Sequence, residues 1–599
     1  MYDVIKEIFS LLNKEQKKQF YKLQILVVLM SLGELIGIAS IAPFMALVGN
    51  INILNGDNII AKIFLYFHFI DPYNFVFIVG IFVLLMLGLS SALSIYTTWK
   101  LIKYSKTVGS EISHRLYSYY MKRDLLFHLN SSSASLTKQI TIESDRVSEN
   151  IITPLMLMNA KIILASLLSI SIFLYNPFVA LVGVTMFLIS YLIIYKLVRK
   201  ELYSNGKELS FTVNKRFQLM NEGFGGIRDI ILLGREKNYI DKFQITTNSY
   251  SYVKGKNNIL SQIPKYFIEF LAFGSMIGLV LYLLSTNKNS LELILPILSV
   301  YALAGFKLLP ALQQIYVSIS NIKGNIASFE SIRDDLVMES QMKDSLKDID
   351  IHTKKYLNNE LLLENISFHY PLKETLVLDN LNMSIKANTT IGIVGYSGSG
   401  KSTTIDIIMG LIEPQKGDVK IDGEVITKTA LREWQNNIGF VAQSIFLSEG
   451  TIAENVAFGI DNNSIDRIKV MESLKMAHLE ELIQDMPLGL DTKVGERGVQ
   501  LSGGQRQRIG IARALYGDKQ ILIFDEATSA LDGITEKIIM DAIDDYSGQK
   551  TIIMIAHRLK TIRKCDLIYF MENGKIVDSG KYEELLKKNE NFKKMDKHA

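Results

Sequence analysis

The chain has 599 residues, of which 48% are hydrophobic, and its formal net charge at pH 7 is +4. A single hydrophobic core rarely grows beyond roughly 250–300 residues, so this length predicts several domains. The small charge excess does not favour nucleic acid as a partner, and a single cysteine, Cys565, excludes an intramolecular disulfide framework or a multi-cysteine metal site. Long apolar runs fill residues 20–310, whereas residues 320–599 have the composition of a soluble α/β domain.

Six apolar segments are long enough to cross a bilayer, which takes about 20 mostly apolar residues. They cover residues 25–48, 76–99, 152–175, 177–198, 266–284 and 291–312. The charged segment 1–24 and the long run after it do not fit a cleavable signal. Lysine and arginine gather in that segment and in the connections after the second and fourth spans, whereas the opposite connections carry only Lys62 and Lys288. Because cytoplasmic loops are rich in these residues, both termini are predicted to be cytoplasmic.

The two cytoplasmic connections are long and are predicted to be helices that continue out of the membrane. Each has a Ser- or Gly-rich break, at residues 128–137 and 221–230, which predicts a turn, a short transverse helix or an ordinary helical hairpin. Residues 58–70, between the first two spans, are too short to span a membrane and too apolar for a free loop. They predict a short helix at the outer membrane surface or an extension of a neighbouring span.

A charged stretch then separates two domains, predicted at residues 1–325 and 359–599 with a linker at 326–358. In the second domain a short buried strand, IGIVG, leads into GYSGSGKST at 395–403 and an apolar helix, which is the context of a phosphate-binding P-loop. Its glycines let the backbone N–H groups point at phosphate oxygens. Lys401 is predicted to reach the β- and γ-phosphates and Ser402 to bind Mg²⁺. The other ATP-binding residues predicted in this loop are Gly395, Tyr396, Ser397, Gly398, Ser399, Gly400 and Thr403.

A second apolar strand, ILIF at 521–524, ends in Asp525 and Glu526. An Asp at the end of a strand parallel to the P-loop strand is placed to meet the Mg²⁺ of a bound nucleotide. Glu526 is placed to polarise a water for in-line attack on the γ-phosphate. Together the two motifs predict a P-loop ATPase with ATP and Mg²⁺ as cofactors.

The sequence LSGGQ at 501–505, continued by RQRIGIARAL, narrows this prediction, because over residues 361–585 the chain resembles the ABC ATPases. Ser502, Gly503 and Gly504 precede a helix, so they are predicted to form a second anion site, flanked by Leu501 and Gln505. The resemblance implies further roles in the ATP site: the adenine-stacking aromatic, the Q-loop residue beside Mg²⁺, the D-loop aspartate and the switch histidine are Tyr370, Gln443, Asp532 and His557. In this family the P-loop and signature of one domain lie on opposite edges, so the resemblance implies a second copy of the chain, or a related chain, as partner.

Six spans followed by one ATPase domain resemble the exporter branch of ABC transporters, and hence a multi-pass protein of the cytoplasmic (inner) membrane. The expected fold is an all-α polytopic membrane domain of six helices followed by an α/β ATPase domain. On this resemblance, residues 124–134 and 222–236 are the two coupling-helix regions.

Ionisable residues in or near the spans are expected to contact the cargo. A charged side chain at mid-membrane raises the free energy of insertion by about 2.5–3.5 kcal/mol, so it usually faces a cavity. A combination of features resembles PglK-type lipid-linked oligosaccharide flippases: Glu34 followed by Pro43 and Phe44, the apolar segment 58–70, residues 264–269, and Lys307 before Pro310. The resemblance implies that such a glycan is the cargo, with membrane lipids around it, and its candidate contacts are Glu34, Lys265, Glu269, Lys307, Phe64 and Phe67. Two alternatives remain at this point, namely snorkelling of Lys307 to the interface and pairing of Glu34 within the bundle.

Two other functions compete with this prediction. One is a multidrug, lipid or peptide exporter with the same fold. The other is a P-loop machine acting on DNA or in translation, which the six spans and the absence of a basic face disfavour.

Overall fold

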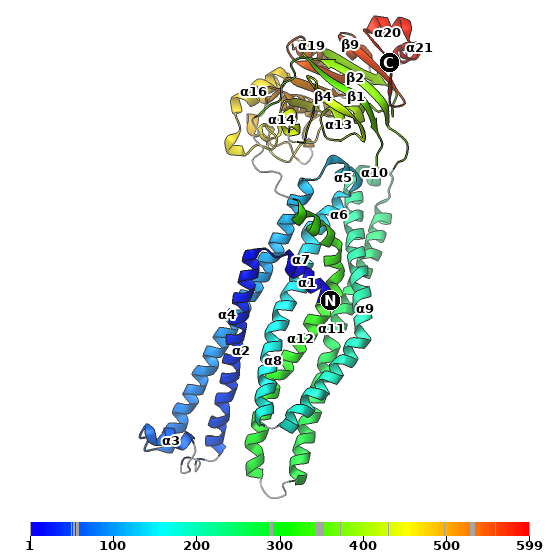
Figure 1. Cartoon of the computed structure of the whole chain (residues 1–599). Helices are drawn as coiled ribbons and strands as arrows, with labels where there is room; N and C mark the ends of the chain where they lie inside the picture. The colour runs from blue at the N-terminus through cyan, green and yellow to red at the C-terminus, as the bar shows by residue number, and fades with distance from the viewer. Residues whose placement is uncertain are drawn as a thin grey trace. The chain divides into compact units, whose positions relative to one another are not determined.

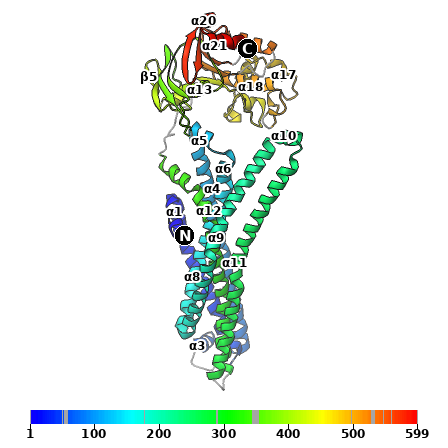
Figure 2. The ribbon, with the colours of Figure 1, turned by 90° about the vertical axis from the view of Figure 1, so that its right-hand side faces the viewer.

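The computed structural model describes residues 2–49, 51, 54, 59–175, 177–286, 291–342, 353–371, 373–428, 430–495, 498–526, 533–544, 546–556 and 559–597 (Figures 1 and 2). The chain divides into two compact units. One consists of residues 1–123 and 128–343, and the other of residues 124–127 and 344–599.

The described part of the first unit is helical. Its helices are α1 (Tyr2–Leu11), α2 (Lys14–Gly49), α3 (Ile59–Tyr66), α4 (Pro72–Met121), α5 (Leu125–Asn130, which begins in the second unit), α6 (Ser133–Lys138), α7 (Ser144–Val147), α8 (Thr153–Tyr175), α9 (Pro177–Gly225), α10 (Ile227–Leu232), α11 (Glu236–Thr286) and α12 (Leu291–Gln341). Two π-helical turns, η2 (Gln139–Glu143) and η3 (Ser148–Ile152), flank α7.

Five predicted spans lie within one helix each, α2, α4, α9, α11 or α12, and the span at 152–175 lies in α8 except for Ile152, the last residue of η3. Within the described residues, three segments are long and apolar enough to cross a membrane, namely Lys14–Gly49, Pro72–Met121 and Ser133–Leu174. α4, α9, α11 and α12 have 49 to 51 residues each, or about 75 Å at 1.5 Å per residue, far more than a bilayer core of about 30 Å. The prediction of helices that continue beyond the membrane is therefore confirmed.

Both predicted breaks contain short helices, with α5 and α6 at the first and α10 at the second. Figure 2 shows α9 and α11 side by side, joined at their ends by α10. Small residues bring α9 and α12 together, because a Cβ on Gly206 would lie 2.4 Å from the Gly324 carbonyl oxygen. Beside Gly206, the side-chain amide of Asn205 donates to Asn257 Oδ1 of α11 at 2.9 Å.

The second unit contains two sheets. An antiparallel sheet has the strand order β2-β1-β4-β5, and a six-stranded, mostly parallel sheet has the order β10-β9-β3-β8-β7-β6. The strands are β1 (Glu360–Phe368), β2 (Leu378–Lys386), β3 (Thr390–Gly395), β4 (Lys416–Ile421), β5 (Glu424–Val425), β6 (Ile438–Val441), β7 (Ile521–Asp525), β8 (Thr551–Ile555), β9 (Leu567–Glu572) and β10 (Lys575–Gly580).

The helices of this unit are α13 (Lys401–Ile408), α14 (Leu431–Gln435), α15 (Ile452–Val456), α16 (Arg467–Met476), α17 (Glu480–Gln484), α18 (Gly503–Leu515), α19 (Gly533–Asp544), α20 (Tyr582–Lys588) and α21 (Glu590–Lys597). The predicted order of an all-α membrane region followed by an α/β domain is confirmed.

Two apolar clusters cover the two faces of the six-stranded sheet. Alternate residues of a strand point to opposite faces, and in β7 Ile523 belongs to the cluster that contains Ile405 of α13. Its neighbour Phe524 belongs to the cluster that contains Ile509 of α18. α13 and α18 therefore cover opposite faces of this sheet.

Candidate functional site

The P-loop, residues 395–403, connects the end of β3 to the start of α13. Gly395 and Gly400 have φ angles of +156° and +100°. A Cβ on Gly395 would lie 2.1 Å from the Met571 carbonyl oxygen, and one on Gly400 would lie 2.7 Å from Leu378. Only glycine fits these two positions, as a tight phosphate-binding loop requires.

Lys401 is buried inside this loop, where its Nζ donates to the carbonyl oxygens of Gly395 at 2.8 Å and Tyr396 at 3.0 Å. Burial lowers the pKa of Lys401, while attraction to Glu526 and Asp525 acts in the opposite direction. The Ser399 hydroxyl is also buried, and among the described residues it has no hydrogen-bond partner. Ammonium, hydroxyl and loop N–H groups together suit an anionic phosphate chain.

The predicted acidic pair lies in the same sheet as the P-loop strand, since β3, β8 and β7 are parallel neighbours with β8 in the middle. Glu526 follows β7 in the left-handed region, with φ +48°, which is uncommon for a residue other than glycine and is often found at functional sites. Gln443 follows β6, and its Nε2 donates to Glu526 Oε2 at 2.7 Å. Gln507 of α18 donates to the Glu526 carbonyl oxygen at 3.3 Å.

Oxygen ligands for a magnesium ion are available here. The Ser402 hydroxyl is exposed in the first turn of α13, and Asp525 ends β7. The described residues contain no group of three or more His, Cys, Asp and Glu side chains that could hold a metal alone. Mg²⁺ prefers one or two protein oxygens completed by phosphate oxygens and water, so this donor set fits Mg²⁺ bound together with a nucleotide.

Two residues of this site were missed by sequence reasoning. Gln507 lies two positions after the signature, and its contact with Glu526 depends on a fold that the sequence does not display. Asp406 of α13 is half-buried, and burial, with repulsion from Asp525, raises its pKa to about 6. Asp406 could have been identified from the sequence, because it lies one turn after Ser402 on the helix that follows the P-loop.

Tyr370 lies beside the P-loop, with its hydroxyl 3.1 Å from Thr403 Oγ1 and its ring edge-on to Phe368. Ser502 is the N-cap of α18: its hydroxyl accepts the Gln505 N–H at 3.2 Å, and Gln505 Oε1 accepts the Ser502 N–H at 2.8 Å. Ser502 and Gly503 are exposed, and Leu501 is buried. Asp532 and His557 lie outside the described residues.

The candidate cargo residues form two ion pairs. Lys307 Nζ of α12 lies 3.5 Å from Glu34 Oε2 of α2, and Ser94 of α4 donates to Glu34 Oε1 at 2.8 Å. Lys265 and Glu269 are 3.9 Å apart, one turn along α11. Phe64 of α3 packs edge-on against Phe75 of α4, with ring centroids 5.3 Å apart, whereas Phe67, just after α3, is 64% exposed. The two phenylalanines therefore have different environments.

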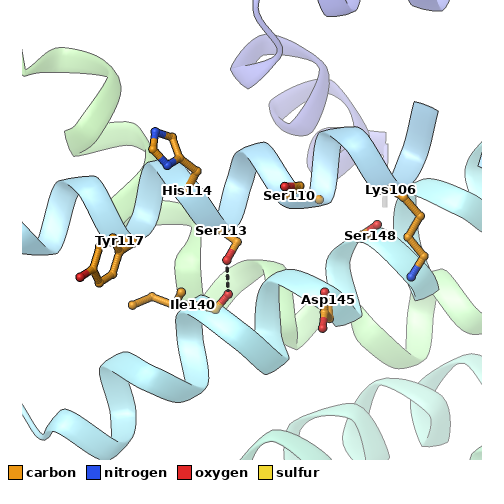
Figure 3. Close-up of a pocket in the computed structure, with 9 residues that line it drawn as sticks. Lys106, Ser110, Ser113, His114, Tyr117, Ile140, Asp145 and Ser148 are labelled. Atoms are coloured by element: carbon orange, nitrogen blue, oxygen red, sulfur yellow. Dashed lines mark hydrogen bonds between the residues drawn. The ribbon is translucent and has the colours of Figure 1, made fainter. Parts of the chain in front are cut away.

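Figure 3 shows a pocket of about 490 Å³ inside the first unit. One wall is α4, with Lys106, Ser110 and His114, and the other is the π-turn region, with Asp145 and Ser148. Ser113 donates to the Ile140 carbonyl oxygen at 2.8 Å across its floor. None of the predicted cargo residues lines this pocket.

Family models match both halves of the chain. The model described as "ABC transporter" matches residues 378–529, and that described as "ABC transporter transmembrane region" matches residues 58–304. An ATP-dependent lipid A-core flippase of Yersinia pestis is 31% identical over 482 residues, which cover 80% of this chain and 81% of the relative. A protein of the same name from Pectobacterium atrosepticum is 31% identical over 520 residues, 86% of each chain.

The fold also matches a solved structure. A bacterial Atm1-family ABC exporter with ATP bound superimposes with a TM-score of 0.79 at 20% identity, over 98% of this chain and 99% of the exporter.

Proposed function

The chain belongs to the ABC transporter family, and from this premise we propose that it flips a lipid-linked oligosaccharide or a similar glycolipid across the cytoplasmic membrane. It is an exporter-type half-transporter and an integral membrane protein, and it couples ATP hydrolysis to transport. The cargo proposal is carried by the likeness, over four fifths of both chains, to proteins named lipid A-core flippases. Lipid A and lipid-linked oligosaccharides share a polar, phosphorylated sugar headgroup on an apolar tail.

For ATP hydrolysis we assign the P-loop and Lys401 to the β- and γ-phosphates, and Ser402 and Asp525 to Mg²⁺, which would neutralise developing negative charge. Glu526 orients and polarises the attacking water. Its hydrogen bond from Gln443 supports this assignment, because it holds the carboxylate in a fixed orientation beside the P-loop sheet. Tyr370 stacks on adenine, and Asp532 and His557 complete the site.

Assembly with a second copy is supported by the placement of two helices on the six-stranded sheet. α13, which follows the P-loop, and α18, which follows the signature, cover opposite faces. The exposed N-terminus of α18, capped by Ser502, is suited to an anion. We propose that it meets the γ-phosphate held by the other chain's P-loop, so that each of two ATP molecules lies between two chains.

The membrane part is proposed to place both termini in the cytoplasm, with the domain boundaries at 1–325, 326–358 and 359–599. The short helices α5 and α10 are assigned as the coupling helices. The helix α3 exposes Ile59, Ile63 and Tyr66, and Phe67, which follows it, is also exposed. That apolar surface is proposed to contact the lipid tail of the cargo.

Reconstituted protein tests the cargo proposal directly. Proteoliposomes that carry a fluorescent polyprenyl-pyrophosphate glycan should show ATP-dependent loss of the glycan from the leaflet that faces the ATPase domain. Fluorescent lipid A, a peptide and a cationic dye serve as competing cargos. Transport of the peptide or dye without either glycolipid would contradict the proposal and favour the alternative, a multidrug or peptide exporter, for which the fold likeness to an Atm1-family exporter is the supporting observation.

A further inference from the structure

Three helices contribute to one polar cluster among the predicted spans. Glu34 comes from α2, Ser94 from α4 and Lys307 from α12. Glu34 is 6% exposed, and both its oxygens have partners, Ser94 at 2.8 Å and Lys307 at 3.5 Å. Leu35 and Leu308, the next residues along the two helices, pack in an apolar cluster with Leu164 and Leu168 of α8. The carboxylate is therefore buried, and the residues next to the pair in sequence belong to an apolar cluster.

Lys307 is held much less firmly than its partner. Its side chain is 44% exposed, and its 3.5 Å distance to Glu34 exceeds the roughly 2.7–2.9 Å of a strong charge-assisted hydrogen bond. An ammonium has three N–H donors, yet Glu34 is its one hydrogen-bond or ion-pair partner in the part of the chain that the structure describes. Two donors are thus available to a second anion.

We propose that the Glu34–Lys307 pair is an exchangeable anion site, at which Lys307 turns from Glu34 to the phosphate of a lipid headgroup. The inference rests on the proposed function, and it adds a role for Glu34 as a built-in competitor. Without cargo, Glu34 neutralises Lys307, which makes the pair tolerable between apolar helices. A phosphate or pyrophosphate carries more charge and more acceptor oxygens than one carboxylate, so it outcompetes Glu34 for the flexible ammonium.

Glu34 does not need to leave its position during the exchange. Its Oε1 keeps the hydrogen bond from Ser94, and only the long contact to Lys307 is given up. Because α2 and α12 are joined by that contact, cargo binding would also release one tie between them. The chemical class recognised is a phosphate-bearing lipid headgroup, whether on lipid A or on a polyprenyl carrier.

Variants of the two residues separate this role from a structural one. The protein is reconstituted in phosphatidylcholine vesicles, and ATPase stimulation is measured relative to each variant's own rate without added lipid. The probes are undecaprenyl pyrophosphate, lipid A, inorganic pyrophosphate and the uncharged undecaprenol. Glu34→Gln removes the competitor and should lower the half-stimulating concentration of the phosphate-bearing lipid about two- to fivefold.

The double variant Glu34→Gln/Lys307→Met removes both charges without leaving a buried charge unpaired, and should raise that concentration at least about tenfold. Lys307→Arg keeps the cation and should respond like the unaltered protein. Thr97→Val is the matched control, because the Thr97 hydroxyl lies one turn after Ser94 and bonds within α4, to the Leu93 carbonyl oxygen. It should leave the half-stimulating concentration unchanged.

Several results would overturn the inference. If Glu34→Gln and the double variant shift the concentration in the same direction, the pair only holds the helices together. If undecaprenol stimulates as well as its pyrophosphate, no anion is recognised, and if inorganic pyrophosphate alone stimulates, the site does not take a lipid. If the lipids stimulate the unaltered protein but neither Glu34→Gln nor the double variant changes the half-stimulating concentration, this inference alone is wrong. If neither undecaprenyl pyrophosphate nor lipid A stimulates the unaltered protein, the proposed function is wrong as well.

Discussion

Replacing Glu526 by Gln should separate ATP binding from ATP hydrolysis. The change keeps the size of the side chain, and the new amide oxygen can still accept the hydrogen bond that Gln443 now donates to Glu526 Oε2 at 2.7 Å. The backbone carbonyl at this position also keeps its contact from Gln507. The variant therefore loses the charge and basicity of the carboxylate while the geometry around it is retained.

Loss of a positioned general base lowers a rate by about 10²–10⁴-fold, which corresponds to about 2.7–5.4 kcal/mol in the activation barrier. ATP affinity should stay the same or increase, because the removed charge is negative and acts near the phosphate-binding Lys401. The measurements are the ATPase rate of the reconstituted protein and the dissociation constant of a fluorescent ATP analogue.

Glu413→Gln makes the same chemical change in an exposed surface pair with Lys428, and should leave both quantities unaltered. A Glu526→Gln protein that hydrolyses ATP within a few-fold of the normal rate would refute the assignment of Glu526. A Glu526→Gln protein that no longer binds ATP would show that Glu526 is needed to hold the nucleotide, which would contradict its assignment to the attacking water.

Three further predictions concern assembly, the outer helix and pH. Mixed dimers of a Lys401→Ala chain with a Ser502→Arg chain should bind one ATP per dimer, more than Lys401→Ala homodimers, because both lesions fall in one site; equal binding would contradict the two-chain site. Phe67→Ser should weaken stimulation by lipid cargo with little effect on thermal stability, whereas Phe64→Ser should lower stability because its ring packs on Phe75; the reverse pattern would count against a cargo surface on α3. Folding raises the pKa of Asp406 from 3.8 to about 6, so the folded state prefers the protonated form and its stability falls as pH rises from about 4 through 6. Asp406→Asn should therefore raise the free energy of local unfolding of α13 in the nucleotide-free protein at pH 7.5, by about 1–2 kcal/mol after allowance for solvent screening. The measurement is slower hydrogen exchange of the α13 amides, and this stabilisation should vanish near pH 4.

The ATPase domain could be predicted from sequence to a large extent because its chemistry is local. The P-loop places strand, glycines, Lys401 and helix within a short segment, and the structure has β3 and α13 at the predicted positions. Asp525 and Glu526 were predicted at a strand end, and they are there. The partners of Glu526 could not be predicted from spacing, since the contact with Gln443 joins residues 83 positions apart.

In the membrane region the positions of the helices could be predicted from sequence, but their contacts could not. Hydropathy predicts where helices lie, but it carries little information about which faces meet. The prediction named Glu34 and Lys307 separately, and pairing of Glu34 within the bundle was an alternative; the structure joins the two residues across 273 positions. Phe64 and Phe67 also looked equivalent in sequence, yet Phe64 of α3 packs on Phe75, whereas Phe67, just after the end of α3, is exposed. This difference depends on tertiary contacts, which hydropathy does not encode. The π turns beside the pocket had no sequence signal either.

The contact between Gln443 and Glu526 explains why an amide suits this position. An amide has donor hydrogens on nitrogen and an acceptor oxygen, so one Gln443 side chain can donate to Glu526 through Nε2 while Oε1 stays available as a ligand for Mg²⁺. A carboxylate at 443 could bind the metal, but it would repel Glu526 at 2.7 Å and raise the cost of keeping both groups ionised. A lysine could donate to Glu526, but it would oppose Mg²⁺. The proposed roles of the two residues in metal binding and water activation are therefore chemically coupled, and a substitution at 443 acts on both.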